Sequence, residues 1–145
     1  MLRRTRRLYR SRRRLLAGVL AAVAMVFGWW LVMLSPFLYD PPGGPVAIDA
    51  DRAHAVFAYG TLRSPLLRWA VTGGAGQARA AVLPGYRREG LNVRPVVDER
   101  VEGVVFEVDA RALRRLDRYE RLGVRYERVE RELLDGTRAW VYRRL

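Results

Sequence analysis

Residues 15–34 restrict the fold of this chain most strongly, because twenty consecutive residues carry no charged side chain. A helix rises about 1.5 Å per residue, so this run spans about 30 Å, the thickness of the hydrocarbon core of a bilayer. The run is apolar on every side, which is untypical of a helix packed on a small soluble core. We therefore predict a single transmembrane helix over residues 15–34, which leaves residues 53–145 for one small domain.

The sequence on either side of this run predicts its orientation. Residues 1–14 contain eight arginines and no acidic residue, and such a segment stays in the cytoplasm. The C-terminal domain is then expected on the non-cytoplasmic side, joined through a Pro/Gly-rich linker at 35–52. The alternative is a cleaved signal peptide of the twin-arginine kind. An anchor is favoured, because the run is longer than a usual signal core and no small-residue cleavage site follows it.

Composition excludes several kinds of chemistry. The chain has no cysteine and one histidine, His54, so thiol catalysis, disulfides, cysteine or histidine metal sites and a serine–histidine pair are not expected. The net charge is +12, and every basic residue is arginine. From residue 41 onward nineteen arginines face fourteen acidic residues, so the domain is only moderately basic. With no recognisable motif to accompany this charge, we expect no nucleic-acid partner.

Hydrophobic patterning predicts an α+β domain, small and β-barrel-like, with two short helices. One helix is expected to begin at Ser64-Pro65, and Asp109 is expected to cap a second that ends at Tyr119. The pair Asp135-Gly136 indicates a hairpin between the last two strands. Strands are predicted over residues 56–59, 80–86, 91–97, 101–108, 124–133 and 137–142.

Tyr59, Gly60, Thr61 and Leu62 follow the apolar first strand and precede the helix start at Ser64. Gly60 permits a positive φ or a close approach of the backbone to a ligand. Free N–H groups of the loop and of the helix start can bind a carboxylate. The alternative interpretation is an ordinary strand–turn–helix junction without a ligand.

Glu120 follows the apolar residues Leu116 and Tyr119 at the end of the second helix. Burial at this position would raise its pKa and keep a proton-transferring carboxyl near working pH. The alternative is a solvated carboxylate paired with Arg118 or Arg121. Tyr126 is interpreted either as a residue of the same site or as a core aromatic. We expect His54 at the surface and the two tryptophans Trp69 and Trp140 in the core. Arg128 is also expected at the surface, and the alternative is that it meets a carboxylate.

Taken in order, these motifs resemble the gamma-glutamylcyclotransferase-like family, and most closely its gamma-glutamylamine cyclotransferase branch. The resemblance covers residues 53–145 and rests on Tyr-Gly-Thr-Leu at 59–62, the strand 103–109, Leu-Asp-x-x-Glu at 116–120, Tyr126-x-Arg128 and a final hairpin. Members usually carry glycine after the glutamate, where this chain has Arg121. An arginine there can narrow the pocket, or pair with Glu120 and lower its pKa.

The resemblance implies an enzyme that uses no metal or cofactor, and the uncharged run at 15–34 adds the expectation that this enzyme is anchored in a membrane. It would cleave a gamma-glutamyl amide by attack of the substrate's own α-amino group, giving 5-oxoproline and a free amine or amino acid. Glu120 would be the general acid/base, and Tyr59, Gly60, Thr61 and Leu62 would bind the glutamyl group. Two alternatives stay open: a non-catalytic module that binds a small carboxylate, and a related gamma-glutamyl deprotection or acyl transfer.

Overall fold

The computed structural model describes residues 14–28, 39, 47–74 and 76–145, which fall into two units, residues 1–38 and 39–145. In the first unit residues 14–28 are helical. Within the described residues, no helix has the length and apolar character needed to cross a membrane. The second half of the predicted span, residues 29–34, lies outside the described residues, as do residues 1–13 and most of the predicted linker 35–52.

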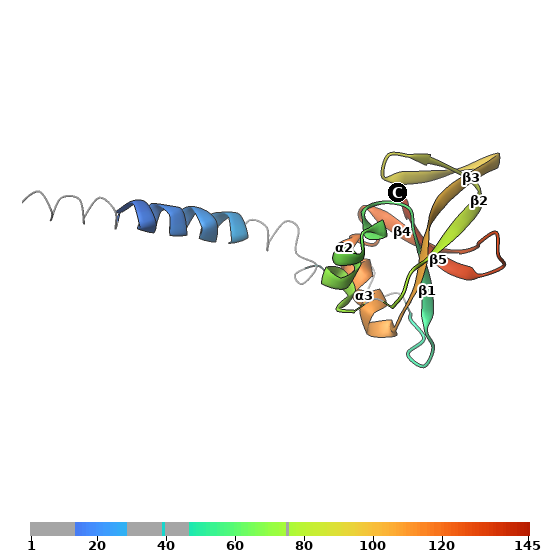
Figure 1. The fold of residues 1–145 in the computed structure, drawn as a ribbon, viewed down its shortest axis with the longest axis horizontal. Helices are drawn as coiled ribbons and strands as arrows, with labels where there is room; N and C mark the ends of the chain where they lie inside the picture. Colours follow the sequence, from blue (N-terminus) through green and yellow to red (C-terminus); the bar gives the residue numbers. More distant parts are fainter. Residues whose placement is uncertain (1–13, 29–38, 40–46, 75) are drawn as a thin grey trace, which may run out of the picture. The chain divides into compact units, whose positions relative to one another are not determined.

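The second unit is an α+β domain built on one five-stranded sheet (Figure 1). The strand order is β2-β3-β1-β5-β4, in which the β1–β5 pair is parallel and the other pairs are antiparallel. Helices α2 and α3 lie next to each other at one side of the sheet (Figure 1). The elements are β1 (His54–Ala58), the 3-10 helix η2 (Thr61–Arg63), α2 (Pro65–Thr72), β2 (Arg79–Glu89), β3 (Asn92–Val108), α3 (Ala110–Tyr119), β4 (Tyr126–Glu132) and β5 (Arg138–Arg144).

The predicted helix boundaries and the last hairpin are confirmed. The Asp109 side chain accepts a hydrogen bond from the Ala112 N–H at 2.6 Å and so caps α3, as its sequence predicts. Pro65 is the first residue of α2, and α2 ends at Gly73, whose φ of 77° is a left-handed helix cap. Asp135 and Gly136 form the turn between β4 and β5.

The predicted strands 91–97 and 101–108 are wrong as separate elements, because both belong to the single strand β3. The residues between them include Asp98, whose φ of 64° is left-handed, so the backbone bends there without leaving the sheet. The partner strand β2 shifts register between Pro84 and Tyr86, which gives the β2–β3 ribbon its bend. The turn of the ribbon is at Gly90 and Leu91, between β2 and β3.

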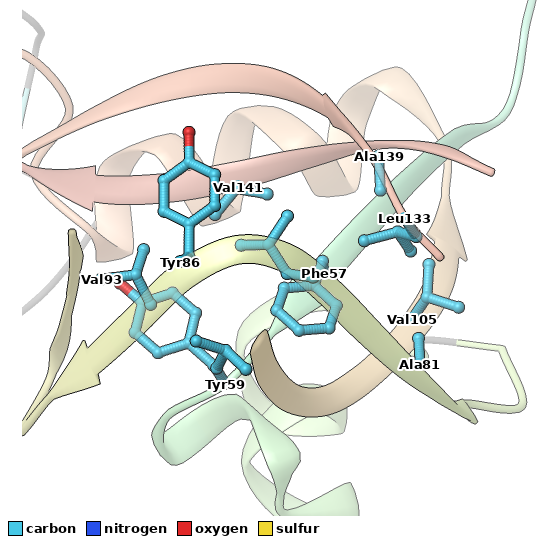
Figure 2. Packing of buried hydrophobic residues seen from close by; sticks show 11 residues of the cluster. Phe57, Tyr59, Ala81, Tyr86, Val93, Val105, Leu133, Ala139 and Val141 are labelled. Carbon is cyan, nitrogen blue, oxygen red and sulfur yellow. The ribbon is translucent and has the colours of Figure 1, made fainter. Parts of the chain in front are cut away.

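Alternating side chains of the central strand β1 and of Tyr59, which follows it, belong to two separate hydrophobic clusters. Phe57 and Tyr59 pack with side chains of all the other strands or of the turns next to them, within the curl of the sheet (Figure 2). Val56 and Ala58 point to the other face, where they pack under α3 against Leu113. The period of two along a strand therefore gives the domain a core on each side of its sheet.

Gly103 shows how closely β1 and β3 approach. A Cβ added at Gly103 would lie 2.7 Å from the Phe57 ring and would also collide with the Ala58 carbonyl oxygen. Only glycine fits this position of β3, because the colliding Ala58 oxygen belongs to the backbone.

Two single-residue expectations are wrong. His54 is buried, with Nε2 2.8 Å from the Asp49 carbonyl oxygen and Nδ1 near the Trp140 indole N–H. Trp69 is 64% exposed together with Leu66 on the outer side of α2. The helix buries Arg68 and Thr72 instead, because both side chains find hydrogen-bond acceptors inside the domain. Trp140 is partly buried, as expected.

Candidate active site

The loop from Tyr59 to Leu62 joins β1 to the 3-10 helix η2. Gly60 has a φ of −112°, so the positive φ that its sequence permits is not used. The carbonyl oxygens of Gly60 and Thr61 accept hydrogen bonds from the amides of Arg63 and Ser64, which closes the 3-10 turn. The predicted junction of strand, turn and helix is therefore present, with a tighter turn than a simple loop.

The amide N–H groups of this turn are available to a ligand. Those of Gly60, Thr61 and Leu62 have no acceptor within the part of the chain that the structure describes. This follows from the position of the three residues, because the first amides of any helix lack partners in the helix. Three consecutive uncommitted donors can bind a carboxylate or an oxyanion.

Arg68 of α2 holds the loop in place through hydrogen bonds to its carbonyl oxygens. Its Nη1 donates to the carbonyl oxygens of Leu62 and Arg63, at 3.0 and 2.7 Å. The guanidinium also lies over the Phe106 ring, 5.5 Å from the ring centroid, and the residue is buried. Arg68 thus binds carbonyl oxygens of the loop and none of its amide groups, so the amides of residues 60–62 stay available to a substrate.

Glu120 is the C-cap residue of α3, and its amide donates to the Leu116 carbonyl oxygen. Burial raises the pKa of Glu120 to about 7, and the positive charge of Arg125 offsets part of that rise. Among the described residues no arginine forms an ion pair with it. The predicted upward pKa shift of Glu120 is therefore confirmed, and the alternative pairing with Arg118 or Arg121 is wrong.

Two tyrosines connect Glu120 with the loop. The pKa of Tyr59 is raised by burial and by the nearby charges of Tyr126 and Glu120. Burial and the charge of Glu120 likewise raise the pKa of Tyr126. Both hydroxyls point to the Leu91 carbonyl oxygen at the tip of the β2–β3 ribbon, at 3.4 Å from Tyr59 and 3.1 Å from Tyr126.

The structure thus brings together most of the predicted site residues. Tyr59, Tyr126 and Glu120 share one region, and Gly60 contacts the same ribbon tip, because a Cβ there would lie 3.5 Å from Leu91. Thr61 is exposed beside them. Leu62 is buried in the cluster under α3, so only its backbone can serve a ligand.

A buried polar cluster behind Glu120 was not found from the sequence. Arg128 donates to both carboxylate oxygens of Asp117, at 3.1 and 2.9 Å, and stacks over Trp140. The Tyr142 hydroxyl donates to Asp117 at 2.6 Å. The side chain of Arg128 is only 1% exposed, which corrects its expected surface position. Asp117 lies four residues after Leu113 on the apolar face of α3, and this spacing was the available signal.

Tyr142 connects this buried cluster to the loop. Its hydroxyl holds Asp117, while its carbonyl oxygen accepts a hydrogen bond of 2.6 Å from Tyr59. Asp117 and Glu120 lie on the same stretch of chain, three residues apart. The two halves of the site are thereby fixed to one another through a single residue of β5.

Arg121 has a φ of 54°, a left-handed conformation that glycine adopts most easily. An arginine in this conformation costs about 1 kcal/mol. Its guanidinium lies over the Tyr39 ring, 5.6 Å from the centroid, and Tyr39 donates to the Leu122 carbonyl oxygen. The family's preference for glycine thus has a backbone reason, and within the described residues Arg121 forms no ion pair with Glu120.

No group of three or more histidine, aspartate or glutamate side chains within the described ranges is arranged to hold a metal ion. The functional groups of the site are the Glu120 carboxyl, the hydroxyls of Tyr59 and Tyr126, and the amides of residues 60–62.

The curled sheet with its helices, the loop at residues 59–62 and the buried carboxyl of Glu120 together define a class of domain. A family model described as gamma-glutamyl cyclotransferase, AIG2-like, matches residues 56–144. The match spans more than half of the sequence, and the chain is a member of that family. Among curated proteins none matches the sequence significantly. The predicted family is confirmed, and these comparisons do not single out the amine branch.

Solved structures agree with the family. A protein from Arabidopsis thaliana, solved in solution, is 26% identical with a TM-score of 0.57, over 67% of this chain and 72% of the other. An uncharacterized protein from Pyrococcus horikoshii is 26% identical with a TM-score of 0.51, over 63% and 77%. A structure described as gamma-glutamyl cyclotransferase is 17% identical with a TM-score of 0.56, over 65% and 68%, and shows the shared fold.

Proposed function

We propose that residues 53–145 cleave gamma-glutamyl amides by internal cyclisation, with Glu120 as general base and then general acid. The observation that carries this proposal is the state of Glu120, a carboxyl with a pKa of about 7 and no cationic partner among the described residues. A group with this pKa accepts and returns protons near neutral pH. The uncommitted amides at residues 60–62 lie in the same region and supply the binding half of the site.

The reaction needs only one protein carboxyl because the nucleophile is part of the substrate. Glu120 takes a proton from the substrate α-ammonium, and the freed nitrogen attacks the γ-carbonyl carbon. The new C–N bond closes a five-membered ring, and the amide bond to the leaving amine breaks. Glu120 returns its proton to the departing nitrogen, and the ring nitrogen gives up its second proton, which ends on the released amine, so the products are 5-oxoproline and an ammonium ion.

The loop supplies position in this proposal. Amides of Gly60, Thr61 and Leu62 would bind the α-carboxylate of the glutamyl group and hold its amine beside the γ-carbonyl. Fixing two reacting groups in one geometry lowers a barrier by removing the entropy of their encounter. A binding module for small carboxylates would use the same amides without proton transfer, and turnover distinguishes the two.

The test is release of 5-oxoproline from a panel of gamma-glutamyl amides by the purified full chain. We expect product from gamma-glutamyl substrates and none from the same substrates acetylated on the α-amine, because acetylation removes the nucleophile. Equal cleavage of acetylated substrates, or release of glutamate in place of 5-oxoproline, would indicate hydrolysis. Absence of turnover on every substrate, with binding retained, would favour the binding module.

We further propose that residues 15–34 hold the domain at a membrane, with residues 1–14 in the cytoplasm. Support comes from the uncharged run and the preceding arginines. A reporter that is active only outside the cytoplasm, fused after Leu145, is expected to be active. Signal from a cytoplasm-only reporter would overturn this orientation, and release of the chain from membranes at alkaline pH would overturn the anchor.

A further inference from the structure

Three exposed arginines surround the candidate site and lack acidic partners. Arg88, Arg125 and Arg144, here called the arginine rim, form no ion pair with any described carboxylate. Arg79 and Arg94, also exposed on the sheet, pair with Asp135 and Glu89, whereas Arg100 and Arg138 are unpaired among the described residues like the rim but are not among the charges that act on the site. The rim therefore carries positive charge that nothing in the described domain balances.

The strand register places Arg144 beside the site. Arg144 lies directly opposite Tyr126 in the antiparallel β4–β5 pair, so the two side chains leave the same face of the sheet. It follows Tyr142 by two residues, and Tyr142 faces Asp117. The row along β5 therefore runs from the buried polar cluster to the position opposite the site residue Tyr126.

Arg88 and Arg125 reach the same region from two other elements. The Arg88 Nε donates to the Gly90 carbonyl oxygen at 2.8 Å, which lays its side chain along the ribbon tip. The carbonyl oxygen of the next residue, Leu91, accepts a hydrogen bond from the Tyr126 hydroxyl and lies 3.4 Å from the Tyr59 hydroxyl. Arg125 directly precedes Tyr126. It lies in a turn that is closed by a hydrogen bond from the Arg125 amide to the Arg121 carbonyl oxygen.

Electrostatic effects agree with this placement. The charge of Arg125 opposes the rise in the pKa of Glu120, and the charges of Arg125 and Arg144 oppose that of Tyr126. The charge of Arg88 acts in the same direction on Tyr59. All three charges are therefore close enough to influence groups of the site.

Resting on the proposed cyclisation, we propose that the arginine rim binds a carboxylate on the leaving half of the substrate. The amides at residues 60–62 already account for the glutamyl carboxylate, so the rim is left for a second anion. Guanidinium groups bind carboxylates through paired N–H donors. The preferred substrates are then gamma-glutamyl amino acids or peptides with a free carboxylate. A leaving group that bears an amine cation would be repelled by the same charges.

The experiment compares gamma-glutamyl-alanine with gamma-glutamyl-alaninamide, which differ only in the charge of the leaving half. For the full chain, kcat/KM for 5-oxoproline release is expected to be at least about tenfold higher for the acid, the value of one charge-assisted contact. In Arg144→Gln this ratio is expected to fall toward one, chiefly through a higher KM for the acid. Arg88→Gln tests the rim from the ribbon side in the same way.

The matched control is Arg138→Gln, since Arg138 is exposed at the opposite end of β5. It removes the same charge from the same strand and is expected to keep the acid-to-amide ratio. Equal kcat/KM for acid and amide in the unmodified chain would overturn the rim proposal while leaving the cyclisation in place. So would an Arg138→Gln effect as large as that of Arg144→Gln, because net charge alone would then explain it.

Discussion

Replacing Glu120 by glutamine is expected to lower kcat/KM for 5-oxoproline release by at least about a hundredfold. Glutamine keeps the shape of the side chain but cannot take a proton from the substrate amine, and general base catalysis contributes a factor of this order or more. The measurement is product release at pH 8, where the Glu120 carboxyl, with a pKa of about 7, is mostly ionised. Glu132→Gln, at the exposed end of β4, is the control and is expected to retain full activity.

The same variant separates a catalytic role from a structural one through its stability. The pKa of Glu120 rises from 4.5 to about 7 on folding, so between these pH values the folded chain holds a proton that the unfolded chain has released. The free energy of unfolding therefore falls as pH rises through this window, by about 3 kcal/mol in total. Glu120→Gln has no carboxyl to titrate at this position. Its free energy of unfolding, relative to that of the unmodified chain, is therefore expected to increase from pH 4 to pH 8. A variant that loses stability at pH 8 would indicate a paired carboxylate and contradict this assignment.

Replacing Asp117 by alanine is expected to lower the free energy of unfolding by about 3 to 5 kcal/mol. The change leaves the Arg128 guanidinium buried without its counter-charge, which is the costly way to break such a pair. It also removes the acceptor of the Tyr142 hydroxyl. Urea unfolding at pH 7 measures the loss.

A second variant shows whether the charge of Arg128 is the cause. In Asp117→Leu combined with Arg128→Met, both charges are replaced by apolar groups, and most of the stability is expected to return. A loss below about 1 kcal/mol in Asp117→Ala would show that water reaches the Arg128 guanidinium. A double variant as unstable as Asp117→Ala would assign the cost to packing around Trp140.

Local signals predicted the parts of this domain that depend on neighbours in sequence. Asp109 caps α3 by accepting a hydrogen bond from the amide three residues later, and Asp135-Gly136 forms the turn of the last hairpin. Both features can be predicted from a few neighbouring residues. Glu120 was singled out because it follows Leu116 and Tyr119 and because the spacing Leu-Asp-x-x-Glu at 116–120 resembles that of the family. Its lack of an arginine partner needed the structure, because it depends on where Arg121 points.

The expectations that failed depend on partners far along the chain. Arg128 was expected at the surface because most arginines are exposed, yet its partners are Asp117 on α3 and Trp140 on β5. His54 is buried through contacts with Trp140, 86 residues later. The joined strand β3 was missed for another reason, since the charged residues around Asp98 imitate a turn while the backbone only bends. Pairing over such distances leaves no periodic trace in the sequence.

The parallel pairing of β1 with β5 has a consequence for how the domain forms during synthesis. Val56 and Phe57 at the centre of the sheet pair with Trp140 and Val141, and Tyr59 hydrogen-bonds to Tyr142. The loop that leaves the ribosome first therefore acquires its partner only when the last strand emerges. Contacts so distant in sequence form slowly. A nascent chain that stops before Tyr142 has every residue of the Tyr59–Leu62 loop and Glu120, yet lacks the contact that orders them into one site.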